Sequence, residues 1–157
     1  MESKENELSR RILFKGKRKI HLIGLDTMVF IYHFEKNQKY FPSTTSILNS
    51  IESGKVKALT SIVSLIEILT GALKLKDKGL AEQYRLTLTS FPNLQLLDLD
   101  QKIGSKAAEL RANYDLKTPD AIQIATSIVS KADSFITNDE RLKIVNEIEI
   151  VLLKEFC

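Results

Sequence analysis

Two kinds of hydrophobic pattern take turns along the chain. Five short apolar runs, bounded by polar or turn-forming residues, are typical of β-strands: KIHLIGLD (19–26), KVKALTS (55–61), NLQLLDLD (93–100), DSFITND (133–139) and IEIVLL (148–153). Between them, apolar residues recur at the three- and four-residue spacing of amphipathic helices. These helical stretches cover about residues 27–35, 42–53, 62–76, 77–90, 100–114 and 117–130.

Short apolar strands that alternate with amphipathic helices indicate parallel strands covered on both faces. We therefore expect an α/β fold, a three-layer α/β/α sandwich around a central parallel five-stranded sheet. A chain of 157 residues suits one such domain, and we assign this domain to residues 19–157. Residues 1–18 then form a basic N-terminal leader.

The net charge of +3 is concentrated at the start of the chain, because residues 1–20 hold seven Lys or Arg against three Glu. This leader is interpreted either as an arm that contacts nucleic-acid phosphates or as a solvated segment before the first strand. No apolar run is long enough to span a membrane, since Glu67 interrupts residues 58–69. With no signal-peptide pattern and a single cysteine, Cys157, we expect a soluble, cytoplasmic protein without disulfides.

Four carboxylates occupy positions that the predicted sheet would bring to one edge. Asp26 and Asp139 each follow an apolar strand, and ligands of parallel sheets bind beyond the carboxyl ends of the strands. Asp120 begins the helix of KTPDAIQIATSIVS, where the Thr-Pro pair predicts a helix start capped by the Thr hydroxyl. Stabilising that helix start is the alternative role of Asp120. Glu67 lies in the apolar stretch SLIEILTG, where burial without a positive partner is costly.

A divalent cation would resolve the repulsion among four converging carboxylates that have no matching set of Lys or Arg. Mg²⁺ and Mn²⁺ prefer oxygen ligands, and such a site activates water for hydrolysis of a phosphodiester. No protein nucleophile competes with this interpretation: the serines have no histidine partner, and the sequence has no glycine-rich phosphate loop, CxxC or HExxH. The residues themselves thus indicate metal-dependent hydrolysis of nucleic acid.

Four segments in order, LDTMVFIY, SIVSLIEIL, KTPDAIQIATSIV and FITNDERL, resemble the four acidic motifs of the PIN domain, most closely in its VapC-type toxin ribonucleases. The resemblance covers about residues 20–153, and TPDAIQIAT is its most specific part. It implies the strand order 3-2-1-4-5, which makes the first and fourth strands neighbours and places Asp26 and Asp139 across one crevice. It also implies an endoribonuclease that cleaves an RNA substrate with Mg²⁺ or Mn²⁺.

The family pattern makes Asp26 and Asp120 the principal metal ligands, with Glu67 and Asp139 completing the catalytic cluster directly or through water. Four further residues match positions that orient carboxylates or water in the family, or else are ordinary caps and turn residues: Thr27, Ser64, Thr137 and Asn138. The resemblance also implies a homodimer and, for the toxin branch, a small antitoxin partner that blocks the acidic crevice. The roughly twenty residues before the first strand depart from the compact toxins.

Two other functions fit parts of the pattern. A phosphoacceptor receiver domain shares this sheet topology, with Asp98 or Asp100 as the acceptor and Lys154 as its lysine. Such a domain needs adjacent acids after the first strand, where this chain has Asp26 followed by Thr27. The second alternative is a PIN-type domain that binds RNA or protein without cleaving it, and the presence of all four acids argues against it.

Overall fold

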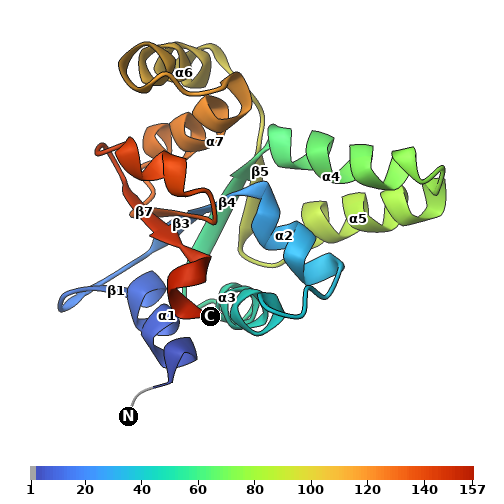
Figure 1. Ribbon diagram of the computed structural model, residues 1–157, viewed down its shortest axis with the longest axis horizontal. Coiled ribbons are helices and arrows are strands. Elements are labelled where there is room, and N and C mark those ends of the chain that lie inside the picture. Colours follow the sequence, from blue (N-terminus) through green and yellow to red (C-terminus); the bar gives the residue numbers. More distant parts are fainter. Residues whose placement is uncertain (1–2) are drawn as a thin grey trace.

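A parallel sheet of five strands forms the middle layer of the computed structural model, which describes residues 3–157 (Figure 1). The strands of this sheet are β3 (Leu22–Leu25), β4 (Lys57–Ser61), β5 (Leu94–Leu97), β6 (Ser134–Thr137) and β7 (Glu149–Leu152). They lie in the order β5-β4-β3-β6-β7, and each neighbouring pair is parallel. Numbered along the chain, this is the expected order 3-2-1-4-5, so the predicted fold class is confirmed.

Successive residues of a strand point to opposite faces of the sheet. Both faces carry apolar side chains, and helices cover both of them. The helices are α1 (Lys4–Leu13), α2 (Thr27–Phe34), α3 (Phe41–Glu52), α4 (Ile62–Lys74), α5 (Lys78–Ser90), α6 (Gln101–Tyr114) and α7 (Thr118–Val129). Ile23, Leu25 and Ile136 share one core with residues of α1, α2 and α3, whereas Phe135 and Ile150 share another with α6 and α7. Within residues 3–157, none of these helices combines the length and apolar character needed to cross a bilayer.

α7 lies close to β3 because the central strand carries a glycine at the point of contact. A Cβ atom on Gly24 would lie 1.9 Å from the hydroxyl oxygen of Ser127 and 2.9 Å from its Cβ. A larger residue would therefore push strand and helix apart. Since Asp120 begins the same helix, the close approach also sets where that carboxylate lies relative to the end of β3.

The N-terminal segment folds against the rest of the protein, which the sequence analysis did not predict. Leu8 and Ile12 of α1 are fully buried, and α1 contacts α3 and the short 3-10 helix η2 (Leu153–Phe156). A hairpin follows, made of β1 (Phe14–Lys15) and β2 (Arg18–Lys19), and it is exposed. The described part of the leader is thus a docked helix followed by an exposed basic hairpin.

The order of the strands keeps apart the aspartates and the lysine that a phosphoacceptor receiver site would need. Asp98 and Asp100 follow β5, whereas Lys154 follows β7, and these strands are the two opposite edges of the sheet. Asp100 instead caps α6, accepting a hydrogen bond from the Ile103 N–H at 2.8 Å. An acceptor aspartate and its lysine therefore do not meet, which excludes a receiver site of this composition.

Candidate active site

Asp26 stands at the junction between the central strand β3 and helix α2. Its N–H continues the ladder to the Ile136 carbonyl of β6 at 2.9 Å. As the N-cap of α2, its Oδ1 accepts the Thr27 N–H at 2.8 Å, and its Oδ2 accepts the Thr137 hydroxyl at 2.7 Å. The pKa of Asp26 is raised to about 6, chiefly by burial and to a smaller extent by two nearby carboxylates, although these hydrogen bonds lower it.

Glu67 and Asp120 are the carboxylates whose charges raise the pKa of Asp26. Glu67 projects from α4, and its Oε1 accepts a hydrogen bond from the Thr27 hydroxyl at 3.3 Å. Partial burial raises the pKa of Glu67, and the charge of Asp120 raises it as well. The three acids therefore lie close enough for like-charge repulsion to disfavour their simultaneous ionisation.

Asp120 lies in the first turn of α7, where the helix dipole favours a carboxylate. The predicted cap is wrong, because the N-cap residue is Lys117 and no side chain caps the helix, so the Thr118 hydroxyl does not do so. Partial burial raises the pKa of Asp120 and the charge of Asp139 adds to this effect, while Arg141 and Lys117 lower the pKa. Asp120 thus interacts with charges of both signs and is more than a helix-end residue.

Asp139 is held by an arginine two residues further along the chain. It caps the 3-10 helix η1 (Glu140–Ile144), and Arg141 donates from Nε to Oδ1 at 3.0 Å and from Nη2 to Oδ2 at 2.6 Å. This ion pair lowers the pKa of Asp139. The expectation that the four acids would have no basic partners is therefore wrong for this member of the set.

A buried network of hydroxyl and amide groups lies behind the carboxylates. The Thr27 and Ser64 hydroxyl oxygens are 3.0 Å apart, and Ser64 lies 2.7 Å from the Thr60 hydroxyl. Gln123 Nε2 donates to Thr27 at 3.1 Å and to Ser64 at 2.7 Å. The sequence analysis missed Gln123, although a buried polar residue one turn after Asp120 in an apolar helix is a visible signal.

A cavity of about 480 Å³ lies at the carboxyl ends of β3 and β6. All four predicted acids line it: Asp26, Glu67, Asp120 and Asp139. Its walls also carry cationic and aromatic side chains, namely Arg141, Lys154 and Tyr32. The cavity therefore offers oxygen ligands for a cation, and its two positive groups pair with acids of the same wall, Arg141 with Asp139 and Lys154 with Glu140.

A family model described as PIN domain matches residues 23–148, which include β4, β5, β6, most of β3 and all four acids. The chain belongs to the PIN domain family. PIN domains are nucleases, so the family indicates a hydrolase that acts on nucleic acid. A search of the curated proteins found no match.

Solved structures of toxin–antitoxin complexes share the fold of this PIN domain. A toxin–antitoxin complex from Klebsiella pneumoniae contains a chain with 21% identity and a TM-score of 0.63, covering 85% of this chain and 97% of that one. VapBC2 from Rickettsia felis, bound to a DNA fragment from its promoter, gives 19% identity and a TM-score of 0.67, covering 82% and 96%. FitAB bound to an IR36 DNA fragment gives 17% identity and a TM-score of 0.66, covering 84% and 94%. At these identities the likeness establishes the fold.

The acids of this PIN domain fit a hard cation without forming a complete cage. Among residues 3–157, no group of three or more His, Cys, Asp or Glu side chains is arranged to hold a metal ion. In addition, Arg141 donates hydrogen bonds to both carboxylate oxygens of Asp139. Mg²⁺ typically keeps several waters and binds one or two carboxylates directly, a number that Asp26 and Asp120 alone supply.

The four residues predicted to support the acids differ in what they contact. Thr137 donates to Asp26 Oδ2, Thr27 donates to Glu67, and Ser64 belongs to the buried network. Asn138 instead joins two other parts of the cavity wall. Its Nδ2 donates to the Tyr32 hydroxyl at 3.3 Å, and its Oδ1 accepts the Lys154 N–H at 3.0 Å. The assignment of these residues to orienting roles stays a prediction.

Proposed function

We propose that this PIN domain is a metal-dependent endoribonuclease and the toxin of a toxin–antitoxin pair. The observation that carries the proposal is the placement of Asp26, Glu67 and Asp120 around one cavity, where the charge of Asp120 raises the pKa of the other two and that of Glu67 raises the pKa of Asp26. Like charges held together at an internal energetic cost are expected where a cation is to be bound. The family and the toxin–antitoxin structures that share the fold support the same function.

In this proposal each charged group has a separate task. Asp26 and Asp120 are the principal ligands of Mg²⁺ or Mn²⁺, and Glu67 and Asp139 complete the cluster directly or through water. Arg141 and Lys154, which pair with Asp139 and Glu140, stand beside them and would exchange these partners for the phosphate of the RNA. The bound cation lowers the pKa of a water and stabilises charge on the phosphoryl oxygens.

The proposal extends to the organisation of the protein. Residues 19–157 form the nuclease domain, and the N-terminal segment is an accessory packed on it. The complex from Klebsiella pneumoniae pairs a toxin with an antitoxin, and we extend this arrangement to a small antitoxin that covers the cavity here. The protein acts on cytoplasmic RNA, and a homodimer is the expected assembly.

A cleavage assay with Asp120→Asn tests the reaction. The substitution keeps the side-chain volume and removes a charge, so turnover should fall by several orders of magnitude, on the order of 10³-fold or more. The parent protein should cleave RNA with Mn²⁺ or Mg²⁺ and stop in excess EDTA. Because water is the nucleophile, the new ends should be a 5′-phosphate and a 3′-hydroxyl.

The matched control for this assay is Asp98→Asn, the same chemical change at an exposed residue that does not line the cavity. It should retain the parent rate. Cleavage that persists in excess EDTA, a parent rate for Asp120→Asn, or cyclic phosphate ends would overturn the proposed reaction.

Two observations favour the alternative of a PIN domain that binds RNA without cutting it. The ion pair between Asp139 and Arg141 and the incomplete cage among residues 3–157 are features that a silent site would have. Isothermal titration calorimetry with Mn²⁺ distinguishes the nuclease from the RNA-binding module. Binding that Asp26→Asn and Asp120→Asn each weaken supports the nuclease, whereas RNA affinity without any cation binding supports the silent module.

A further inference from the structure

Lysines gather at the edge of the sheet where its strands begin. The N–H of Lys57 donates to the His21 carbonyl, and the N–H of Asp133 donates to the next carbonyl, that of Leu22, so the starts of β4 and β6 flank the start of β3. The hairpin leads directly into β3. We use the name basic edge for the six exposed lysines of this region: Lys15, Lys17, Lys19, Lys55, Lys57 and Lys131.

These lysines are not neutralised by the acids around them. Asp133 is paired with Arg18 at 2.7 Å and also accepts two backbone N–H groups. Glu52, at the end of α3, is the remaining acid next to these strand starts. Among the described residues, no ion pair involves any lysine of the basic edge, so most of its positive charge faces solvent.

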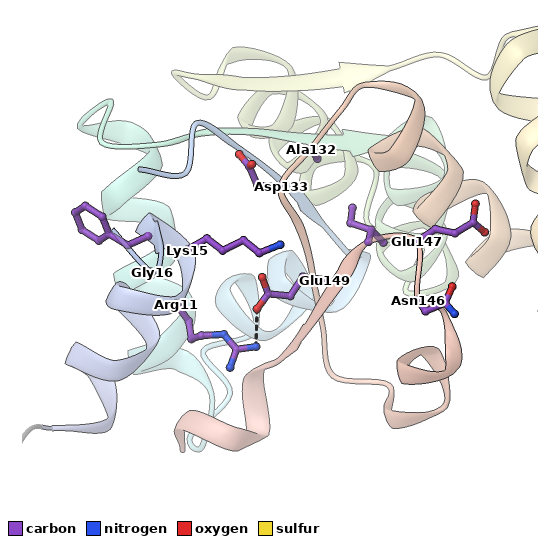
Figure 2. Close-up of a pocket in the computed structure, with 10 residues that line it drawn as sticks. Arg11, Lys15, Gly16, Ala132, Asp133, Asn146, Glu147 and Glu149 are labelled. Atoms are coloured by element: carbon purple, nitrogen blue, oxygen red, sulfur yellow. Dashed lines mark ion pairs between the residues drawn. The ribbon is translucent and has the colours of Figure 1, made fainter. Parts of the chain in front are cut away.

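A hollow of about 520 Å³ lies between the hairpin and the starts of β6 and β7 (Figure 2). Figure 2 shows Lys15 reaching into it from the hairpin. Its acids are already occupied, because Glu149 pairs with Arg11 at 2.7 Å and Glu147 with Lys106 at 2.5 Å. The hollow therefore leaves the ammonium group of Lys15 available to an anion.

An exposed aromatic ring accompanies the lysines. Phe14 of β1 retains 45% of its surface exposed and lines the same hollow. It pairs with Lys19 across the hairpin, while Lys15 pairs with Arg18. Aromatic faces beside flexible cations are the usual means of holding single-stranded nucleic acid without reading its sequence, since every base can stack and every phosphate can pair with a lysine.

The basic edge lies at the opposite ends of the strands from the acidic cavity. Strands of four or five residues, at about 3.3 Å per residue, separate the two by roughly 13–17 Å. In Figure 1 the hairpin projects at the left, whereas α2 and α4 leave the other ends of their strands. A phosphate in the cavity therefore cannot touch the basic edge, and only a longer chain can reach both.

We infer that the basic edge, with Phe14, is a second binding surface for single-stranded RNA, which holds the substrate away from the bond that is cut. This inference rests on the proposed function for the identity of the polyanion. The surface contributes affinity and leaves the chemistry in the cavity unchanged. Long RNA therefore binds more tightly than an oligonucleotide that fills only the cavity.

The test compares two triple variants with the same change in net charge. Lys15→Gln/Lys17→Gln/Lys19→Gln alters the hairpin, and the control alters exposed lysines elsewhere: Lys74→Gln/Lys78→Gln/Lys102→Gln. Binding of a fluorescent 25-nucleotide single-stranded RNA is measured by anisotropy in EDTA over a range of salt. For the hairpin variant we expect affinity to fall on the order of tenfold at 0.1 M salt. The slope of log K against log salt should decrease by about 2, the value for three lost phosphate contacts on a single strand.

Kinetics with Mn²⁺ complete the test. With the long RNA, the hairpin variant should show a raised KM and an unchanged kcat, while cleavage of a trinucleotide should match the parent.

A second variant, Phe14→Leu, should weaken binding of single-stranded RNA about fivefold or more and leave binding of duplex RNA unaffected. Equal binding of long RNA by the hairpin and control variants would overturn the inference, as would a hairpin variant that loses only its binding to vesicles of anionic lipid.

These outcomes separate the inference from the proposed function. Lysine-dependent RNA binding without cleavage by the parent would leave the basic edge in place and remove the nuclease assignment. Cleavage of the long RNA that does not depend on the hairpin lysines would support the nuclease assignment and overturn the role of the basic edge.

Discussion

Asp26 carries an energetic conflict in the metal-free protein. It caps α2 and accepts the Thr137 hydroxyl, yet burial and two neighbouring acids raise its pKa to about 6. An aspartate in an unfolded chain ionises near a pKa of about 3.9. Between these values the folded protein holds a proton that the unfolded chain has lost, so the free energy of unfolding falls as the pH rises from about 4 to 6 and stays lower above that range.

Asp26→Asn should therefore stabilise the metal-free protein at neutral pH. Asparagine remains a good N-cap residue, and it carries no charge to desolvate. In EDTA at pH 7.5 we expect the free energy of unfolding to rise by about 2 kcal/mol, whereas at pH 4 the two proteins should be nearly equal. Urea unfolding at the two pH values measures this. A destabilised variant at pH 7.5 would mean that the hydrogen bonds to the carboxylate outweigh its burial.

At the scale of elements, the position of α7 depends on the absence of a side chain at Gly24. The hydroxyl of Ser127 occupies the space that a Cβ there would need, 1.9 Å away. Because the strand and the helix each lead to an acid of the candidate site, Asp26 and Asp120, a displaced α7 changes the cavity as well as the core.

Gly24→Ala should destabilise the protein by about 1–3 kcal/mol, the usual cost of forcing extra atoms into a packed core. Ser127→Gly in the same chain should restore part of this loss, which a double-mutant cycle by urea unfolding would detect. Gly71→Ala is the matched control, since a Cβ at Gly71 in α4 meets nothing within 4 Å and alanine is the better helix former. An unaffected Gly24→Ala would show that α7 moves away freely.

The strands and two acids of the candidate site could be predicted from the sequence, because they follow from hydrophobic periodicity and from the positions of strand ends. The apolar runs located the strands, and the rule for carboxyl ends located Asp26 and Asp139. Helix α1 escaped because KENELSRRIL is mostly polar, and the burial of Leu8 depends on partners far along the chain. The pairing of Arg141 was missed for the same reason, since periodicity does not show which ion pair a residue forms. Gln123 was visible as a polar residue in an apolar helix, but its hydrogen-bond partners Thr27 and Ser64 lie far away in the sequence.

At the scale of the whole molecule, α1 joins the first and last parts of the described chain. Leu8 and Ile12 share a core with Ile47 of α3 and Phe156 of η2. The ammonium group of Lys4 donates to the Cys157 carbonyl at 2.7 Å. The N-terminal helix thus packs into the core of the domain, which is why lysine substitutions in the hairpin test RNA binding more cleanly than removal of the segment.

Leu8→Ala should lower the free energy of unfolding by about 2–4 kcal/mol, because it leaves a cavity in a fully buried position. Leu75→Ala is the control: that side chain is 74% exposed, and its loss should change stability by less than about 0.5 kcal/mol. Thermal or urea unfolding of the two variants gives the comparison. Equal stabilities would mean that α1 is only loosely attached.

The central position of β3 also determines when the candidate site can form during synthesis. Asp26 and Thr137, which hydrogen bond across the β3–β6 boundary, are 111 residues apart in the chain. Contacts of such high sequence separation form late, and the ribosome delivers the N-terminal part first. A nascent chain that has completed β3, β4 and β5 already holds Asp26 and Glu67, but Asp139 reaches them only once β6 has docked. A chain interrupted before residue 134 would therefore have three of the four acids and no assembled cavity.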